Sequence, residues 1–129
     1  MTYFDELKEA MEFLGRDERT VFLGQAVAVA GTAMSKTLVG VDRDKVIEFP
    51  VAEEMQMGVT VGLALSGRIP VSIYPRWNFL LLAFNQLINH LDKARYLIGD
   101  EVSFNAIIRT GIGSERPLHP QHQHVGDFT

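Results

Sequence analysis

The sequence predicts an α/β fold of three layers, in which a parallel sheet is flanked by helices. Short apolar runs, bounded by charge, Gly or Pro, recur along the chain and are typical of buried strands. Segments with helical periodicity or small residues separate these runs. This alternation indicates βαβ units, and therefore a parallel sheet covered on both faces. We expect one domain over residues 1–129, with an irregular tail over residues 110–129.

Three segments have the periodicity and end signals of helices. Apolar residues at helical spacing predict a helix over residues 2–14, with Gly15 as its C-cap. A second helix is expected over residues 53–65, because its acidic start suits the positive end of the helix dipole. A longer amphipathic pattern predicts a third helix over residues 79–98, with Asn78 as its N-cap.

Four short segments are predicted to be strands. Pro50 ends the second of them, because a proline forces the residue before it into an extended conformation. The small residues of segment 25–40 indicate a loop with a short helix. The predicted strands cover residues 21–23, 46–49, 70–74 and 104–108. Parallel sheets bind ligands beyond the carboxyl ends of their strands, so functional residues are expected at those ends.

Composition excludes several classes of function. The net charge is −4 and the basic residues are scattered, which argues against a nucleic-acid-binding surface. The chain has no cysteine, so thiol catalysis and cysteine–zinc sites are excluded. The N-terminus is acidic, and no apolar run approaches the roughly 18 residues that span a bilayer. We therefore expect a cytoplasmic protein that acts on neither nucleic acid nor membrane.

Two features at the start of the second helix could carry function. Glu53 and Glu54 follow a strand at the point where the helix begins, and glycines recur at Gly58 and Gly62 along one helix face. The carboxylates could be ordinary surface charges favoured by the helix dipole. The glycines could serve tight packing within the domain, or they could let the backbone of a second subunit approach closely.

Three histidines close to the C-terminus, His119, His122 and His124, could together bind zinc or nickel. No cysteine accompanies them, and the segment has no predicted scaffold. Adventitious metal binding is therefore favoured over a physiological metal site. His90, inside the third helix, is interpreted as a surface or interface residue.

The combined pattern resembles the pyrimidine-binding domain of thiamin-diphosphate enzymes, especially that of the beta subunit of 2-oxo acid dehydrogenases. These domains open a helix with Glu-x-x-x-x-Gly, which here is Glu53 and Gly58, followed by Gly62. Residues 62–71 are similar to the family's "G-x-A-x-x-G-x-x-P-V" run, and residues 109–113 with 121–122 are similar to its "R-x-P-x-G … Q-H" segment. The resemblance extends over residues 21–122, with differences in loop length.

The resemblance implies roles for individual residues. Glu53 would contact the ring nitrogen of the cofactor's aminopyrimidine, where a carboxylic acid promotes the imino tautomer that removes the thiazolium proton. Phe79 would pack against the aminopyrimidine. His122 would face the reactive end of the cofactor and donate to the substrate carboxylate or to an intermediate. Gln25 and Pro75, which follow the first and third strands, are expected among the cofactor contacts.

Several departures from the family pattern limit the resemblance. Gln25 stands where beta subunits usually carry a glutamate, and Pro75-Arg76-Trp77 differs from the usual small and aromatic residues. The family's Gly-Asp-Gly … Asn motif, which holds magnesium and diphosphate, is absent, since Gly99-Asp100 is followed by Glu101. The family domain also continues for several strands and a second domain. We therefore expect thiamin diphosphate to be shared with an alpha-type, diphosphate-binding partner that holds the magnesium.

The sequence is compatible with three hypotheses about its function. The first is the pyrimidine-binding part of a thiamin-diphosphate-dependent 2-oxo acid dehydrogenase, inactive without its partner. The second is a truncated, non-catalytic domain that associates with itself through the helix bearing Gly58 and Gly62. The third is a relative with other thiamin chemistry, such as ketol transfer in the manner of transketolase. Because an uncovered sheet edge and an uncovered helix face favour association, a homo-oligomer is expected.

Overall fold

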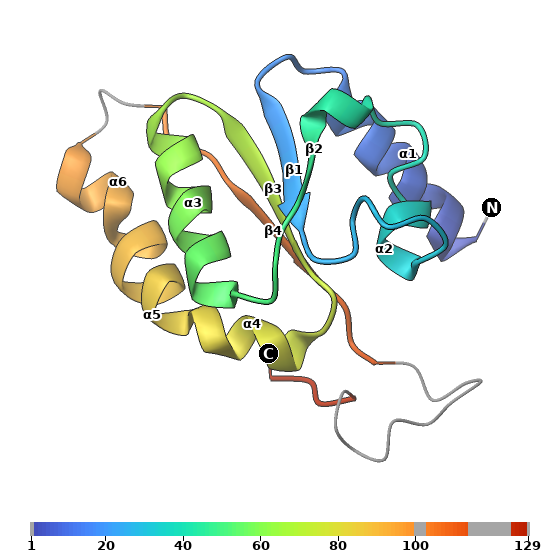
Figure 1. The fold of residues 1–129 in the computed structure, drawn as a ribbon. Coiled ribbons are helices and arrows are strands. Elements are labelled where there is room, and N and C mark those ends of the chain that lie inside the picture. Colours follow the sequence, from blue (N-terminus) through green and yellow to red (C-terminus); the bar gives the residue numbers. More distant parts are fainter. Residues whose placement is uncertain (1, 100–102, 114–124, 129) are drawn as a thin grey trace.

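The computed structural model describes residues 2–99, 103–113 and 125–128 of the chain. Its centre is a sheet of four parallel strands in the order β2-β1-β3-β4. Helices lie on both sides of this sheet (Figure 1), which confirms the predicted three-layer α/β fold. The strands are β1 (Thr20–Gly24), β2 (Val46–Glu48), β3 (Ile69–Tyr74) and β4 (Ile107–Thr110).

The first layer contains α1 (Tyr3–Gly15) and the short α2 (Ala33–Lys36). Thr2 and Asp5 form a capping box at the start of α1, in which each side chain accepts a hydrogen bond from the backbone N–H of the other. The predicted helix begins and ends within one residue of the observed one, but its C-cap is Arg16 and not the predicted Gly15. The loop with a short helix that was predicted for residues 25–40 is also confirmed.

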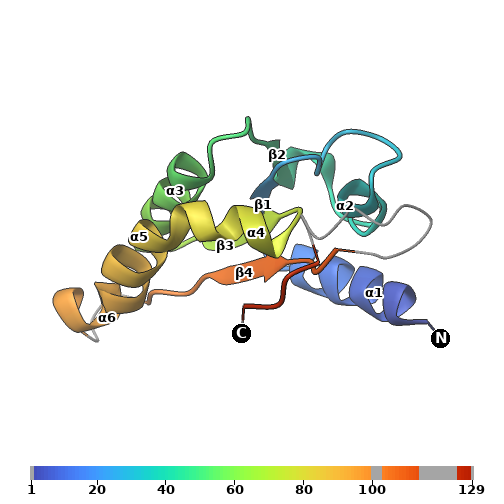
Figure 2. The same ribbon diagram turned by 90° about the horizontal axis from the view of Figure 1, so that it is seen from below.

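The opposite layer contains α3 (Glu53–Leu65) and a long, irregular helical stretch from Trp77 to Ile98. The bounds of α3 match the prediction. The stretch is divided into α4 (Trp77–Leu80), the 3₁₀ turn η2 (Leu81–Ala83), α5 (Phe84–Gln86), the π-helical η3 (Leu87–Leu91) and α6 (Asp92–Ile98). Figure 2 shows that these segments follow one another along one side of the sheet.

The prediction that Asn78 is the N-cap of this stretch is wrong. The helix begins at Trp77, two residues before the predicted start, and Arg76 is its N-cap with no side-chain hydrogen bond. A main-chain hydrogen bond holds the start of the helix instead: the N–H of Trp77 donates to the carbonyl of Gly111 at 2.9 Å. A contact with a residue so distant in sequence fixes where the helix starts, and a local capping pattern contains no information about it.

The fourth strand lies further along the chain than the predicted residues 104–108. It pairs in parallel with β3, with Val71 opposite Ile107 and Tyr74 opposite Thr110. The register follows from packing: Ile107 packs with the apolar cluster on one face and Ile108 with that on the other. Thr110 is thus the last residue of β4 and not part of the tail, whose residues 114–124 lie outside the described part of the chain.

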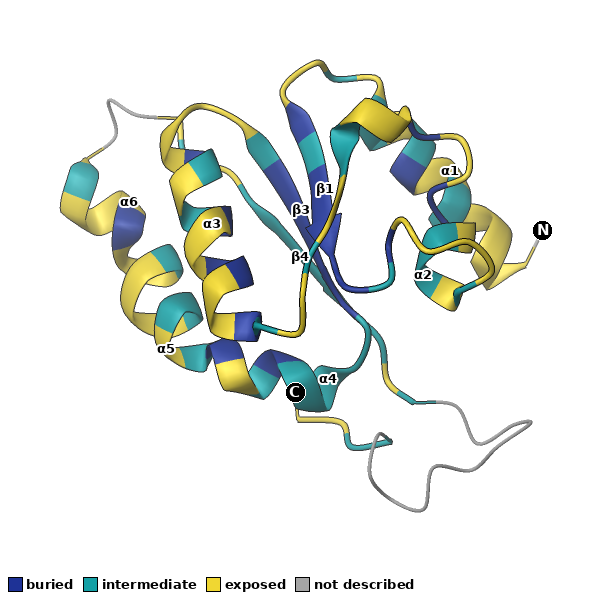
Figure 3. Ribbon diagram, in the orientation of Figure 1, coloured by how far each residue is buried: buried dark blue, intermediate teal, exposed yellow. Residues whose placement is uncertain are grey.

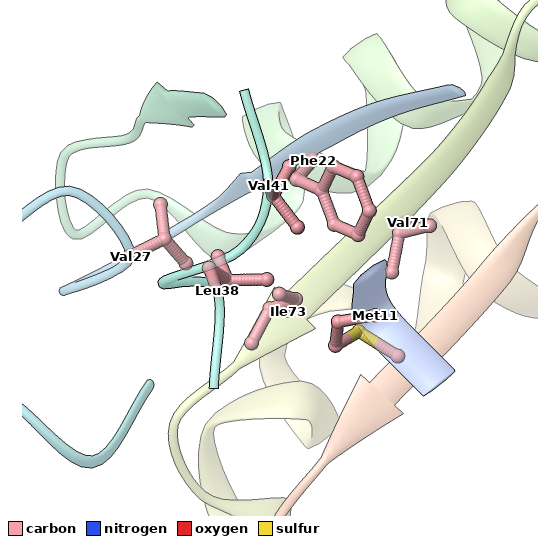
Figure 4. Close-up of a cluster of buried hydrophobic side chains, with 7 residues drawn as sticks. All are labelled: Met11, Phe22, Val27, Leu38, Val41, Val71 and Ile73. Carbon is pink, nitrogen blue, oxygen red and sulfur yellow. The ribbon is translucent and has the colours of Figure 1, made fainter. Parts of the chain in front are cut away.

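Two apolar clusters hold the three layers together, one on each face of the sheet. Alternation along β3 separates them, since Val71 and Ile73 point to one face while Tyr74 points to the other. The first cluster is shown in Figure 4 and consists of Met11, Phe22, Val27, Leu38, Val41, Val71 and Ile73. The second consists of Met57, Tyr74, Leu80 and Ala83. Figure 3 shows the central strands as the most continuous buried region.

None of the helices in the described ranges is both long enough and apolar enough to cross a lipid bilayer.

Candidate active site

The site predicted at the carboxyl edge of the sheet lies where the chain reverses its order of strand addition. β1 has β2 on one side and β3 on the other, so the connections after β1 and β2 leave the sheet in opposite directions. Such a switch point opens a crevice at the carboxyl ends of the two central strands. Gln25 follows β1 and Pro75 follows β3, and a short connection leads from the end of β2 to the start of α3 (Figure 1).

Glu53 is the first residue of α3, and its side chain is buried with 5% exposure. A carboxylate is costly to bury without a partner. Here the side-chain amide of Gln25 donates from Nε2 to Oε1 of Glu53 at 3.0 Å, and Gln25 is itself only 8% exposed. The structure therefore brings together two residues that lie 28 positions apart in sequence and that were both predicted as site residues.

Tyr74, the last residue of β3, contacts the start of α3. Its hydroxyl donates to the backbone carbonyl of Glu53 at 3.4 Å. Burial raises the pKa of Tyr74 to about 12, with the nearby charge of Glu53 acting in the same direction. The phenol therefore stays protonated at neutral pH and can donate this hydrogen bond.

Gln56 is a buried polar residue near Glu53 that was not among the predicted site residues. It is fully buried on the same face of α3 as Glu53, and its Nε2 donates to Oγ of Ser72 at 3.0 Å and to the carbonyl of Ile73 at 3.2 Å. Its Oε1 is buried without a hydrogen-bond partner among the described residues. A signal was available, because an amide three positions after Glu53 must share its helix face.

A cavity of about 350 Å³ lies beside Glu53. It is lined by Ala52, Glu53, Glu54, Met55 and Leu82. Its volume falls in the range of small-molecule sites, which begins at about 300 Å³. Glu54 is exposed to solvent, so the two neighbouring carboxylates occupy different environments: one is held inside the fold and the other lies at the rim.

The other predicted cofactor contacts lie on the same side of the molecule but are not part of that cavity. Phe79 is half-buried on α4 and is not among the cavity's lining residues, whereas Leu82, three residues later, is. Pro75 is half-buried at the end of β3, where its carbonyl accepts a hydrogen bond from the guanidinium of Arg76 at 3.0 Å. The roles of both residues remain predictions.

Arg109 lies on β4, in the segment similar to the family's "R-x-P-x-G" run. Its Nη1 donates to Oγ1 of Thr37 at 2.7 Å, which joins β4 to the end of α2. Burial lowers the pKa of Arg109 from its ordinary value. Arg109 therefore holds the end of α2 against the sheet at β4.

His122, the second predicted catalytic residue, and its neighbours His119 and His124 lie outside the described residues. His90 is exposed on η3, as expected for a surface residue. Within the described ranges, no group of three or more His, Asp or Glu side chains is arranged to hold a metal ion.

Curated relatives of the chain are beta subunits of the pyruvate dehydrogenase E1 component. The protein from Gracilaria tenuistipitata var. liui is 34% identical over 123 residues, which are 92% of this chain and 38% of that protein. The mitochondrial proteins of Drosophila melanogaster and Caenorhabditis elegans are 33% and 32% identical over 126 residues, which are 95% of this chain and 34% and 36% of those proteins. The chain thus spans little more than a third of the length of these relatives.

The match to the family itself is broader than any one motif. The profile described as "Transketolase, pyrimidine binding domain" matches residues 1–126. The four parallel strands between two helical layers, with Glu53 buried at the head of α3, agree with that match. The chain belongs to the family of transketolase-type pyrimidine-binding domains.

Proposed function

We propose that the chain is the pyrimidine-binding part of a thiamin-diphosphate-dependent 2-oxo acid dehydrogenase of the beta-subunit type. The observation that carries the proposal is the carboxyl group of Glu53, buried at the head of α3 beside a cavity of about 350 Å³. A buried acid at the wall of a small-molecule cavity is the arrangement expected for proton transfer to a bound ring. The similarity to pyruvate dehydrogenase E1 beta subunits supports the substrate class.

The residues of the chain fit an aminopyrimidine at this position. Within the described residues, the Glu53 carboxylate accepts its hydrogen bond at Oε1, from Gln25. This leaves Oε2 to share a proton with a ring nitrogen that enters the cavity. Met55 and Leu82 supply apolar contacts for the ring. When bound, thiamin diphosphate supplies a carbon nucleophile that adds to the carbonyl carbon of the 2-oxo acid.

The residues of this chain would hold a proton at the cofactor ring and orient the cofactor. Glu53 holds a proton at the ring nitrogen, and the burial of its side chain fixes the position of that carboxyl group. Tyr74 fixes the backbone of Glu53 from the sheet side. Phe79, Gln25 and Pro75 are proposed cofactor contacts, and His122 is proposed to face the substrate.

The proposal includes a partner for the diphosphate end of the cofactor. The sequence lacks the Gly-Asp-Gly … Asn motif, so an alpha-type subunit would hold the diphosphate and its magnesium ion.

The test is coexpression of the full chain with an alpha-type subunit that carries the Gly-Asp-Gly motif, followed by assay of pyruvate and branched 2-oxo acid decarboxylation. We expect Glu53→Gln to lower kcat by about 10²–10⁴-fold, which is the usual contribution of a positioned acid or base. Glu6→Gln is the matched control, because Glu6 is an exposed glutamate in the first turn of α1. Unchanged activity of the Glu53→Gln complex would refute the assignment.

A second candidate function, self-association without catalysis, is favoured by the outer face of α3. Gly58 and Gly62 are exposed, and a Cβ added to either would meet nothing within 4 Å. Met55 and Val59 on the same helix are 49% and 38% exposed. A face with open glycines and exposed apolar side chains suits the backbone of a second subunit. Light scattering of the chain alone tests this: a monodisperse monomer contradicts a homo-oligomer.

A further inference from the structure

The loop that carries Gln25 into the site has an unfavourable backbone conformation. Ala26, the next residue, has a φ of +60°, in the left-handed region that L-residues with a Cβ seldom adopt. The backbone just before Gln25 is tightly packed. A Cβ on the preceding Gly24 would collide with the backbone carbonyl of Ile73, so the chain at this point lies directly against β3. Other contacts must hold Ala26 in its conformation.

Glu48 supplies those contacts from the end of β2. Its Oε1 accepts a hydrogen bond from the N–H of Ala26 at 2.6 Å, and its Oε2 accepts one from the N–H of Ala28 at 2.7 Å. Short bonds from two backbone amides to one carboxylate are charge-assisted and strong. The hydroxyl of Thr32 also holds the loop, because it donates to the carbonyl of Ala26 at 2.6 Å.

Glu48 thereby acts on Glu53 through Gln25. Gly24 and Glu48 are register partners on the adjacent strands β1 and β2, which places the carboxylate of Glu48 beside the first loop residues. Ala26 follows Gln25 directly, so the orientation of the Gln25 side chain depends on the conformation that Glu48 imposes. The Nε2 of Gln25 then reaches Oε1 of Glu53.

We propose that Glu48 is a positioning residue, which clamps the loop after β1 so that the Gln25 amide orients the carboxyl group of Glu53. The clamp itself stands on the hydrogen bonds of this chain, whereas its bearing on catalysis rests on the proposed function. Loss of the clamp frees Gln25 and lets the Glu53 side chain adopt other rotamers. In a complex with an alpha-type subunit, Glu48→Gln is expected to lower kcat about tenfold while the KM for the 2-oxo acid stays within twofold.

The decisive experiment follows the side-chain amide of Gln25 by NMR in the isotope-labelled full chain, without cofactor or partner. We expect Glu48→Gln to speed the solvent exchange of that amide at least tenfold and to move its proton resonance toward the position of an exposed amide. Glu18→Gln is the matched control, since Glu18 is an exposed glutamate in the turn before β1, and it should leave both readouts unchanged. Unchanged exchange in Glu48→Gln overturns the proposal.

Ala26→Gly supplies an independent check, because glycine adopts a positive φ at little cost. In an Ala26→Gly background, the effect of Glu48→Gln on Gln25 exchange should fall at least threefold, and an undiminished effect contradicts the clamp. If Glu48→Gln fails to fold, the wild-type chain decides the matter. Backbone amides of Ala26 and Ala28 that exchange as fast as those of an unstructured peptide overturn the proposal. Failure of the complex with an alpha-type subunit to bind thiamin diphosphate would refute the proposed function and leave the clamp untouched.

Discussion

Removing the Gln25 side-chain amide should destabilise the fold by an amount that depends on Glu53. In Gln25→Leu, the side-chain volume is nearly kept while the buried carboxylate loses its donor. A hydrogen bond to a charged group contributes about 1.5–3 kcal/mol, so we expect a loss of about 2 kcal/mol at pH 7. For a chain of 129 residues, the entropy of unfolding is about 0.27 kcal/mol per kelvin, which converts this loss into a fall in Tm of about 7 °C.

A double-mutant cycle separates this pair from general damage to the core. Glu53→Leu alone should also destabilise the chain, because it leaves the Gln25 amide buried without an acceptor. The double variant Gln25→Leu/Glu53→Leu should cost less than the sum of the single changes, since apolar groups then replace both partners. Urea unfolding, followed by circular dichroism with an unchanged m-value, gives the three free energies. A coupling energy below about 0.5 kcal/mol would refute the reasoning.

The remaining predictions concern backbone packing and pH. Gly24→Ala should destabilise by more than about 3 kcal/mol or prevent folding, because its Cβ would overlap the Ile73 backbone, whereas ordinary stability in chemical unfolding would contradict that contact. Gly58→Ala and Gly62→Ala should each stabilise the monomer by about 0.5–1 kcal/mol, since both helix positions are open, and a loss of stability would argue against an open face. Tyr74 should remain protonated at pH 10.5 in ultraviolet absorbance. Because folding raises its pKa from 10.0 to about 12, the stability it contributes is complete below pH 10 and is lost as the pH rises toward 12.

The regular elements could be predicted where local and tertiary signals agree. The apolar run before Gly24, the proline after Phe49 and the acidic start at Glu53 predicted the first two strands and α3 to within one residue at each end. Each of these signals is local, because it depends on residues that are only a few positions apart in the sequence. The position of Glu53 at the carboxyl edge of the sheet followed from the same alternation of strands and helices.

Features that depend on partners distant in sequence could not be predicted. The start of the long helical stretch at Trp77 is fixed by a hydrogen bond to Gly111, and the π-helical segment η3 has the same apolar spacing as an ordinary helix. The register of β4 is set by β3, which draws the polar residues Arg109 and Thr110 into the strand. The bond between Gln25 and Glu53 depends on side-chain directions that spacing alone does not specify.

The all-parallel order of the strands also affects how the chain is synthesised and folds. Each strand pair is separated in sequence by a crossover, so β1 cannot complete its hydrogen bonds until β3 has left the ribosome. At roughly 5–20 residues per second of translation, that interval lasts several seconds. During it, the apolar edge around Phe22 and Leu23, which is fully buried in the folded chain, is open to other nascent chains. The yield of native protein should therefore depend on translation speed and on chaperone supply.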